Sequence, residues 1–201
     1  GEIADRLLLR LLNDIGDDPD QLPILQHALM RTWDLFEERG GSGALDLEHY
    51  QATGGMGEAL SRHADEVYSE LPDDEHKRIA EKLFKSLTEK VDANRGIRRP
   101  MQLAELHEIC GGEESHLRDV LDAFRKTGCT FLMPAGEAKI KTKTVIDISH
   151  ESLMRAWRSL RNWVDEEAQS AKIYRRLADT ATLYHEDKAG LYRDPDLQIS
   201  L

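Results

Sequence analysis

Apolar residues recur at helical intervals through the first seventy residues of the chain, and no segment there alternates between apolar and polar positions. Spacings of three and four residues predict amphipathic helices. The predicted helices lie over residues 3–15, 22–39 and 56–71, with a short one within residues 45–55. Segments rich in glycine, proline and acidic residues separate them, as expected for helix ends and caps. The sequence therefore predicts an all-helical segment without strands.

The helical pattern continues after Pro72 with three further helices. The first lies within residues 72–90 and carries acidic residues in its opening turn, where the helix dipole favours them. A second helix is predicted over residues 100–110, entered at Pro100, and a third over residues 113–127. The apolar faces of the first and third consist of Ile79, Leu83, Phe84, Leu87, Leu117, Val120, Leu121 and Phe124.

Two β-rich runs follow these helices, over residues 129–133 and 140–148, with the turn sequence PAGEA between them. This pattern predicts a β-hairpin. Two final helices are predicted over residues 150–167 and 170–187, before the loop sequence LYRDPD. Three helices followed by a hairpin are the element order of a winged helix.

The predicted fold class is mainly α, a helical bundle followed by a winged-helix domain. The bundle covers residues 1–71, and the winged-helix domain with its small β-hairpin wing covers residues 72–167. Residues 168–201 are predicted to form a C-terminal helix and the start of a linker to a following domain.

Composition places the chain among soluble globular proteins. Of the 201 residues, 40% are hydrophobic and 32% are charged, and no apolar stretch approaches the roughly 20 residues of a membrane helix. The N-terminal segment has no secretory-signal pattern, and Cys110 and Cys129 lack metal or disulfide spacing. We therefore expect a cytoplasmic protein with two reduced thiols in or near the core.

The chain carries none of the sequence motifs of an independent enzyme. There is no GxxxxGK[ST] phosphate loop, no GxSxG, no HExxH and no paired CxxC, and the eight histidines are scattered. The net charge of -11 also argues against nucleic acid as the main partner. We expect no catalysis and no metal site within the chain.

The most informative stretch is VIDISHESLMRAWRSLRNWV, where a strand runs into a helix. Ser149 is predicted to cap that helix, which places His150 at the first helical position, near free backbone N–H groups. A neutral His150 there could donate one N–H to a phosphate oxygen. The alternative is that His150 only packs against or caps the corner between strand and helix.

Three blocks carry a resemblance that covers nearly the whole chain. They are LPILQHALMRTW at 22–33, LEHYQATGGMGEALSRHADEVYSEL at 47–71 and ISHESLMRAWRSLRNWV at 148–164. In this order they resemble the bacterial novel STAND NTPases that precede WD-repeat propellers. The resemblance implies a lid-like helical domain and a winged helix that together regulate a signalling ATPase, off with ADP and on with ATP.

The resemblance also implies partners, cofactors and site residues. The partners would be a nucleotide-binding domain and C-terminal sensor repeats of the same protein, with ADP or ATP and magnesium bound there and a homo-oligomer on activation. Pro23 would lie against the adenine and His150 would contact the β-phosphate of ADP. The chain departs from the methionine-histidine-aspartate form of the sensor, because Ser149 and Glu151 flank His150. Pro23 is explained equally well as a first-turn helix proline.

Two further groups of residues leave alternatives open. Arg95, Arg98 and Arg99, in the sequence NRGIRRP, could meet an acidic partner or a nucleotide phosphate, or form a solvated loop. Three alternating lysines are interpreted as protection of a wing edge strand, and Trp157 and Trp163 as part of a packing stripe. The lysines are Lys139, Lys141 and Lys143.

A DNA-binding winged-helix regulator is the competing function. Its recognition helix would be EESHLRDVLDAFRKT at 113–127, which has four carboxylates against three basic side chains. Such a helix is a poor reader of DNA, whose phosphates attract lysine and arginine. A third alternative is that the winged helix is only a rigid spacer.

Overall fold

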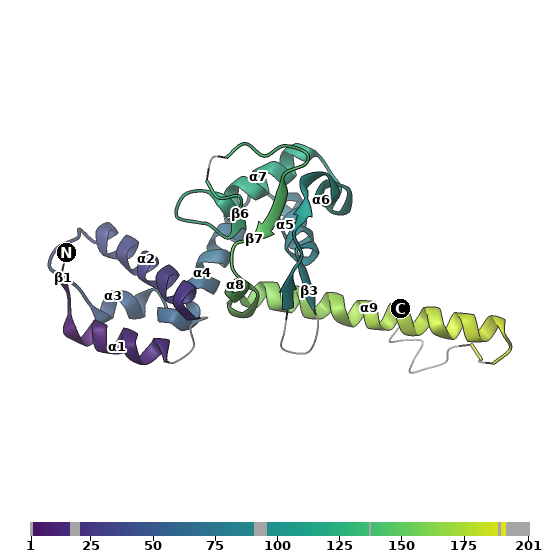
Figure 1. Ribbon diagram of the computed structural model, residues 1–201, viewed down its shortest axis with the longest axis horizontal. Helices are drawn as coiled ribbons and strands as arrows, with labels where there is room; N and C mark the ends of the chain where they lie inside the picture. The colour runs from purple at the N-terminus through teal and green to yellow at the C-terminus, as the bar shows by residue number, and fades with distance from the viewer. Residues whose placement is uncertain (1, 17–20, 91–95, 137, 189, 192–201) are drawn as a thin grey trace.

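The computed structural model describes residues 2–16, 21–90, 96–136, 138–188 and 190–191. The described chain is mainly helical with a few short strands, which confirms the mainly α prediction. It consists of an N-terminal group of helices, a second group that packs with a small sheet, and a long C-terminal helix that extends away from both (Figure 1).

The N-terminal group has four helices. They are α1 (Asp5–Ile15), α2 (Leu22–Glu38), α3 (Leu47–Ala52) and α4 (Gly55–Ser69). Their inward faces form one hydrophobic cluster that includes Leu7, Phe36 and Tyr50. Leu7 and Tyr50 are almost fully buried because the helical spacing of the sequence turns one apolar stripe of each helix inward.

The prediction of a strand-free N-terminal segment was wrong. Strand β1 (Glu2–Ile3) pairs in parallel with β2 (Ala44–Leu45). Each strand has only two residues, too few to show the alternation by which a strand is recognised in sequence. The pair also joins segments about forty residues apart, so it depends on tertiary contact.

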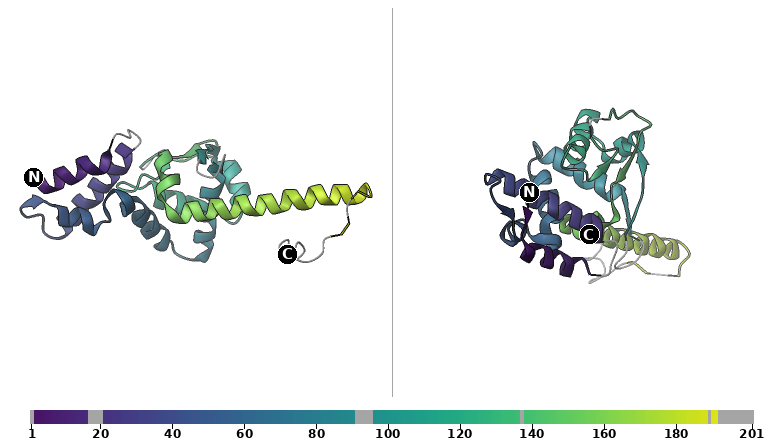
Figure 2. Two further views of the ribbon diagram at one scale, coloured as in Figure 1. Left: turned by 90° about the horizontal axis from the view of Figure 1, so that it is seen from below. Right: turned by 60° about the vertical axis from the view of Figure 1, so that its left-hand side comes forward.

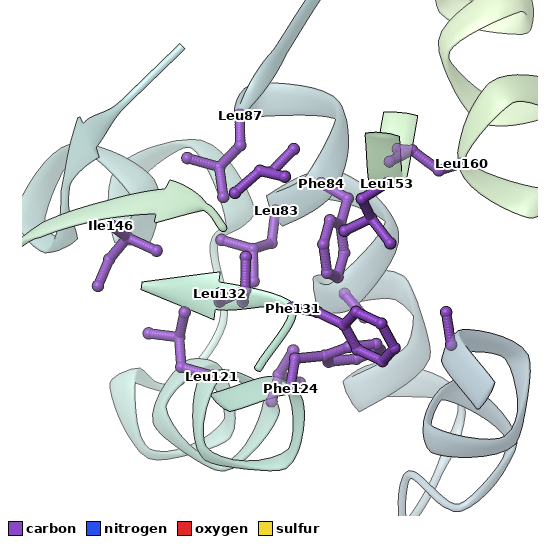
Figure 3. Packing of buried hydrophobic residues seen from close by; sticks show 14 of the residues in the cluster. Leu83, Phe84, Leu87, Leu121, Phe124, Phe131, Leu132, Ile146, Leu153 and Leu160 are labelled. Carbon is purple, nitrogen blue, oxygen red and sulfur yellow. The ribbon is translucent and has the colours of Figure 1, made fainter. Parts of the chain in front are cut away.

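The second group contains α5 (Asp74–Ser86), α6 (Leu103–Cys110) and α7 (Glu114–Arg125). A three-stranded sheet packs with these helices, in the order β5-β7-β6 with both pairings antiparallel. Its strands are β5 (Met101–Gln102), β6 (Leu132–Met133) and β7 (Val145–Ile148). Figure 3 shows Leu83 and Phe84 of α5 facing Phe124 of α7 and Leu132 of β6 across the core of this group.

Several predicted boundaries in this group were wrong. The helix expected from residue 100 begins at Leu103, because Met101 pairs with Ile146 in the sheet. The strand expected over residues 140–148 begins only at Val145. The three wing lysines therefore lie outside any strand, and their interpretation as edge-strand protection was wrong.

A second small hairpin occupies the segment that was predicted as the end of a helix and a loop. Helix α5 ends at Ser86, and β3 (Thr88–Lys90) then pairs antiparallel with β4 (Gly96–Arg98). Arg98 is thus a strand residue opposite Thr88. Arg95 lies outside the described residues.

The C-terminal helices break at a different place from the one predicted. Helix α8 (Glu151–Ala156) ends before Trp157, and α9 (Arg158–His185) then runs without interruption through residues 168–169. Trp157 has an extended backbone, with φ -77° and ψ 108°. At 28 residues α9 is about 42 Å long, and its second half extends beyond the rest of the molecule (Figure 2).

Helix α4 belongs to both hydrophobic clusters. Met56 and Ala59 pack in the N-terminal cluster, whereas Leu60, Ala64 and Val67 pack in the cluster of the second group. Helix α4 thus packs against both groups. The predicted domain boundary at residue 71 stays a prediction.

Candidate functional site

His150 lies between the end of β7 and the start of α8. Its backbone is extended, with φ -148° and ψ 141°, so His150 is the N-cap of α8 and Glu151 is the first helical residue. The prediction that Ser149 caps the helix was wrong by one position. The reason is that the Ser149 N–H donates to the carbonyl of Phe131 at 3.0 Å, which keeps Ser149 aligned with the sheet.

The His150 ring uses one nitrogen as the helix cap. Its Nδ1 accepts the backbone N–H of Ser152 at 3.2 Å and lies 3.0 Å from the Ser152 hydroxyl. A neutral imidazole whose Nδ1 accepts carries its proton on Nε2. Among the described residues none accepts a hydrogen bond from that Nε2–H, and the side chain is half-buried. His150 therefore caps the helix and retains a second, uncommitted donor.

The segment that carries His150 is fastened to α4. The indole Nε1 of Trp157 donates to Asp65 at 2.6 Å, and the Ser159 hydroxyl donates to the same carboxylate oxygen at 2.7 Å. The backbone N–H of Arg158 donates to the Ser61 hydroxyl at 3.2 Å. These contacts bind the joint between α8 and α9 to the helix that both clusters share, so the position of His150 is tied to α4.

Pro23 lies in the first turn of α2, half-buried, as the sequence predicted for a helix proline. It shares one helix face with His27, four residues later. The His27 ring contacts the ring of Phe131 at 5.4 Å, and the carbonyl of Phe131 holds Ser149. A short chain of contacts thus connects the helix face of Pro23 to the residue before His150.

Two histidines form the centre of this junction. His63 Nδ1 of α4 lies 3.2 Å from His27 Nε2 of α2, and both rings contact Phe131. Burial, reinforced by the nearby Arg31 guanidinium, lowers the pKa of His27 to about 4 and that of His63 to about 3. Both imidazoles are therefore neutral near pH 7.

Arg98 and Arg99, predicted as one group with Arg95, lie in different places. Arg98 Nη1 donates to Asp147 Oδ2 at 2.9 Å and to the carbonyl of Ile148 at 3.1 Å, which fixes the end of β7 beside His150. Arg99 follows the end of β4 and lines a groove between α5 and α9.

The thiols and acidic groups offer no reactive centre in the described part of the chain. Cys110 and Cys129 are buried, as the sequence predicted, and burial raises the pKa of their thiols to about 11 and about 12. No group of three or more histidine, cysteine or carboxylate side chains is placed to hold a metal ion among the described residues. In that same part of the chain no helix is long and apolar enough to cross a membrane.

No local pattern in the sequence marks His27, His63, Phe131 or Asp65 as site residues. Each takes its role from a partner far along the chain. Asp65 and Trp157, for example, are 92 positions apart.

Comparison with known proteins identifies a sequence family. The sequence family described as Novel STAND NTPase 1 matches residues 1–190. No curated protein and no solved structure matches the chain.

Proposed function

The chain belongs to the Novel STAND NTPase 1 family, and on that premise we propose that it senses the nucleotide state of a signalling ATPase. It would hold the protein off with ADP and release it with ATP. The observation that carries the proposal is the His150 ring, whose Nδ1 is committed to Ser152 while Nε2–H has no acceptor among the described residues.

The proposed contact is a hydrogen bond from His150 Nε2–H to the β-phosphate of ADP. His150 can donate one hydrogen bond to a phosphate oxygen. The sequence has no phosphate loop that could bind the remaining phosphate oxygens. The nucleotide and its magnesium would be held by a nucleotide-binding domain outside these residues, which would also carry out hydrolysis. Pro23, on the same helix face as His27, would lie against the adenine.

Differential contact with the two nucleotide states supplies the energy of such a switch. A hydrogen bond to a charged group contributes about 1.5–3 kcal/mol. Trp157 and Ser159 tie the His150 segment to α4, which packs in both groups of helices. Gain or loss of the phosphate contact would therefore change the packing of both groups. This conformational change would alter the contacts of the two groups with the sensor repeats and with further copies of the protein.

The arrangement of the second group supports a winged helix as the sensing module. Helices α5, α6 and α7 precede β6 and β7, and β5 joins them in a sheet of order β5-β7-β6. The segment between β6 and β7 is the proposed wing.

Side-chain pairing weighs against the DNA-binding alternative. Arg125 of α7 is only 4% exposed, and it donates to the carbonyls of Pro134 and Ala138 and to Asp122. Arg118 is bound by Glu114. These arginines hold the wing and the helix rather than face a phosphate backbone. A mobility-shift titration at low salt tests this, since a salt-dependent complex would favour DNA binding.

The substitution His150→Asn in the whole protein tests the sensing role. Asparagine is a good N-cap, so it can accept the Ser152 N–H while removing the Nε2 donor. We expect ADP release to accelerate about ten- to a hundredfold, the equivalent of one charge-assisted hydrogen bond, and basal signalling to rise. Release of a fluorescent ADP analogue measures the first effect.

Two companion variants make the result specific. His150→Ala removes both the cap and the donor, so it should lose ADP retention and also about 0.5–2 kcal/mol of stability. His185→Asn changes an exposed histidine in the last turn of α9 and should release ADP at the original rate. Unchanged ADP retention and signalling in His150→Asn would instead favour a rigid spacer.

A further inference from the structure

A groove of about 720 Å³ lies between α5 and α9, bordered by β3 and by the residue after β4. Its volume lies within the range of about 300–1,000 Å³ that is typical of small-molecule sites. His150 is not among the residues that line it.

The groove is basic in a chain that is acidic overall. Five basic side chains and three acidic ones line it, whereas the whole chain has a net charge of -11. Lys85 neutralises Glu81 at 2.7 Å and lies 3.8 Å from Glu167. Arg78 is paired with a carboxylate that does not line the groove, Glu75, at 2.6 Å.

Three cations remain without a carboxylate partner among the described residues. They are Lys82 of α5, Arg99 after β4 and Arg175 of α9. Lys82 Nζ donates only to the backbone carbonyl of Cys110, at 3.3 Å. The backbone N–H of Arg99 donates to the carbonyl of Leu87 at 2.8 Å, which anchors Arg99 beside the start of β3. Three separate parts of the chain thus bring positive charge to one groove, which Glu89 also lines.

Apolar side chains also line the groove. They include Ile109 of α6 and Val164 and Ala168 of α9. Thr88 lines it too, but its Oγ1 is shielded from solvent and has no hydrogen-bond partner among the described residues. The groove therefore offers three cations and an apolar surface for an uncharged part of a ligand.

We infer that this groove binds a small molecule that carries two or more phosphate groups. Arginine matches the tetrahedral oxygens of phosphate with two donors at once, and lysine adds a point charge with single donors. Such a ligand would bridge Lys82, Arg99 and Arg175, and would brace α9 against α5. The site is separate from the nucleotide contact proposed for His150, and it does not depend on that proposal.

Calorimetric titration of inorganic tripolyphosphate into the 201-residue chain tests the inference. We expect saturable binding at one site. The double variant Arg99→Gln/Arg175→Gln should weaken that binding at least about tenfold, because two charge-assisted contacts are lost. Both arginines are exposed, so the thermal unfolding of the free variant should be unchanged.

A matched control locates the site. Lys141→Gln/Lys143→Gln makes the same change of net charge on the segment before β7 and should bind with the original affinity.

Three results would overturn the inference. One is the absence of saturable binding, and another is an equal loss of affinity in the lysine and arginine double variants, which would indicate only general charge attraction. The third is tighter binding of a poly-glutamate peptide than of tripolyphosphate, which would assign the groove to an acidic protein segment.

Discussion

At the scale of single residues, Trp157 performs two tasks at once. Its ring is fully buried and meets those of Phe84 and Phe124, at centroid distances of 4.8 Å and 5.8 Å. Its Nε1 donates to Asp65 of α4 at 2.6 Å. Its extended backbone separates α8 from α9 because the side chain must reach the core and the carboxylate together.

The substitution Trp157→Phe should lower the free energy of unfolding by about 1–3 kcal/mol. Phenylalanine keeps most of the apolar ring, but the half-buried Asp65 loses one of its two donors and keeps only Ser159, and the smaller ring leaves a void. Urea unfolding followed by circular dichroism measures the change. Trp33→Phe is the matched control, since Trp33 is 44% exposed, and an equal loss in both variants would contradict the role of the Asp65 contact.

At the scale of elements, the start of α4 depends on Gly54. Gly54 has φ +94°, a left-handed conformation that other residues rarely adopt, and it is the N-cap of the helix. A Cβ at Gly54 would lie 2.8 Å from the Cβ of Glu58. Gly57 is already inside α4 and has open space around it. The backbone conformation thus requires glycine at Gly54 but not at Gly57.

Opposite effects are therefore expected from two identical substitutions. Gly54→Ala should destabilise the protein by about 1–2 kcal/mol, the usual cost of a left-handed L-residue. Gly57→Ala should stabilise it by about 0.5–1 kcal/mol, because alanine restricts the unfolded chain and favours the helix. Chemical unfolding of both variants measures the difference, and stabilisation by Gly54→Ala would show that the α4 start can rearrange.

At the scale of the whole molecule, the two groups of helices meet at α4 and at the contact between His27, His63 and Phe131. Both imidazoles are held neutral there by burial, whereas an unfolded histidine titrates near pH 6.5. As pH falls below 6.5, the unfolded state therefore binds protons before the folded state does. The junction loses stability through that range until the folded pKa values, about 4 and about 3, are reached.

The free energy of unfolding should consequently fall between pH 6.5 and 4, the window set by these pKa values. The double variant His27→Gln/His63→Gln cannot titrate and should show a shallower fall over the same range. Urea unfolding at pH 7 and pH 5 compares the two proteins. His185→Gln, at the exposed end of α9, should keep the original slope. Equal slopes in the double variant and the original chain would place the acid sensitivity elsewhere.

The sequence by itself determined which segments are helices and that His150 lies where a strand meets a helix. Helical periodicity records that one face of a segment is buried, so α1, α2, α5 and α7 could be predicted within a few residues. The sequence also identified the family, through long motifs that can be recognised without knowledge of tertiary contacts.

Tertiary structure decided the features whose partners are distant in sequence. Met101 is a strand residue because Ile146 pairs with it. Trp157 ends α8, and its indole binds Asp65, which lies 92 positions away in the sequence. Arg98, the last residue of β4, binds Asp147, whereas Arg99, the next residue in the sequence, lines the groove. The spacing of apolar residues predicts that a side chain is buried, but only the tertiary structure shows which residues it packs against.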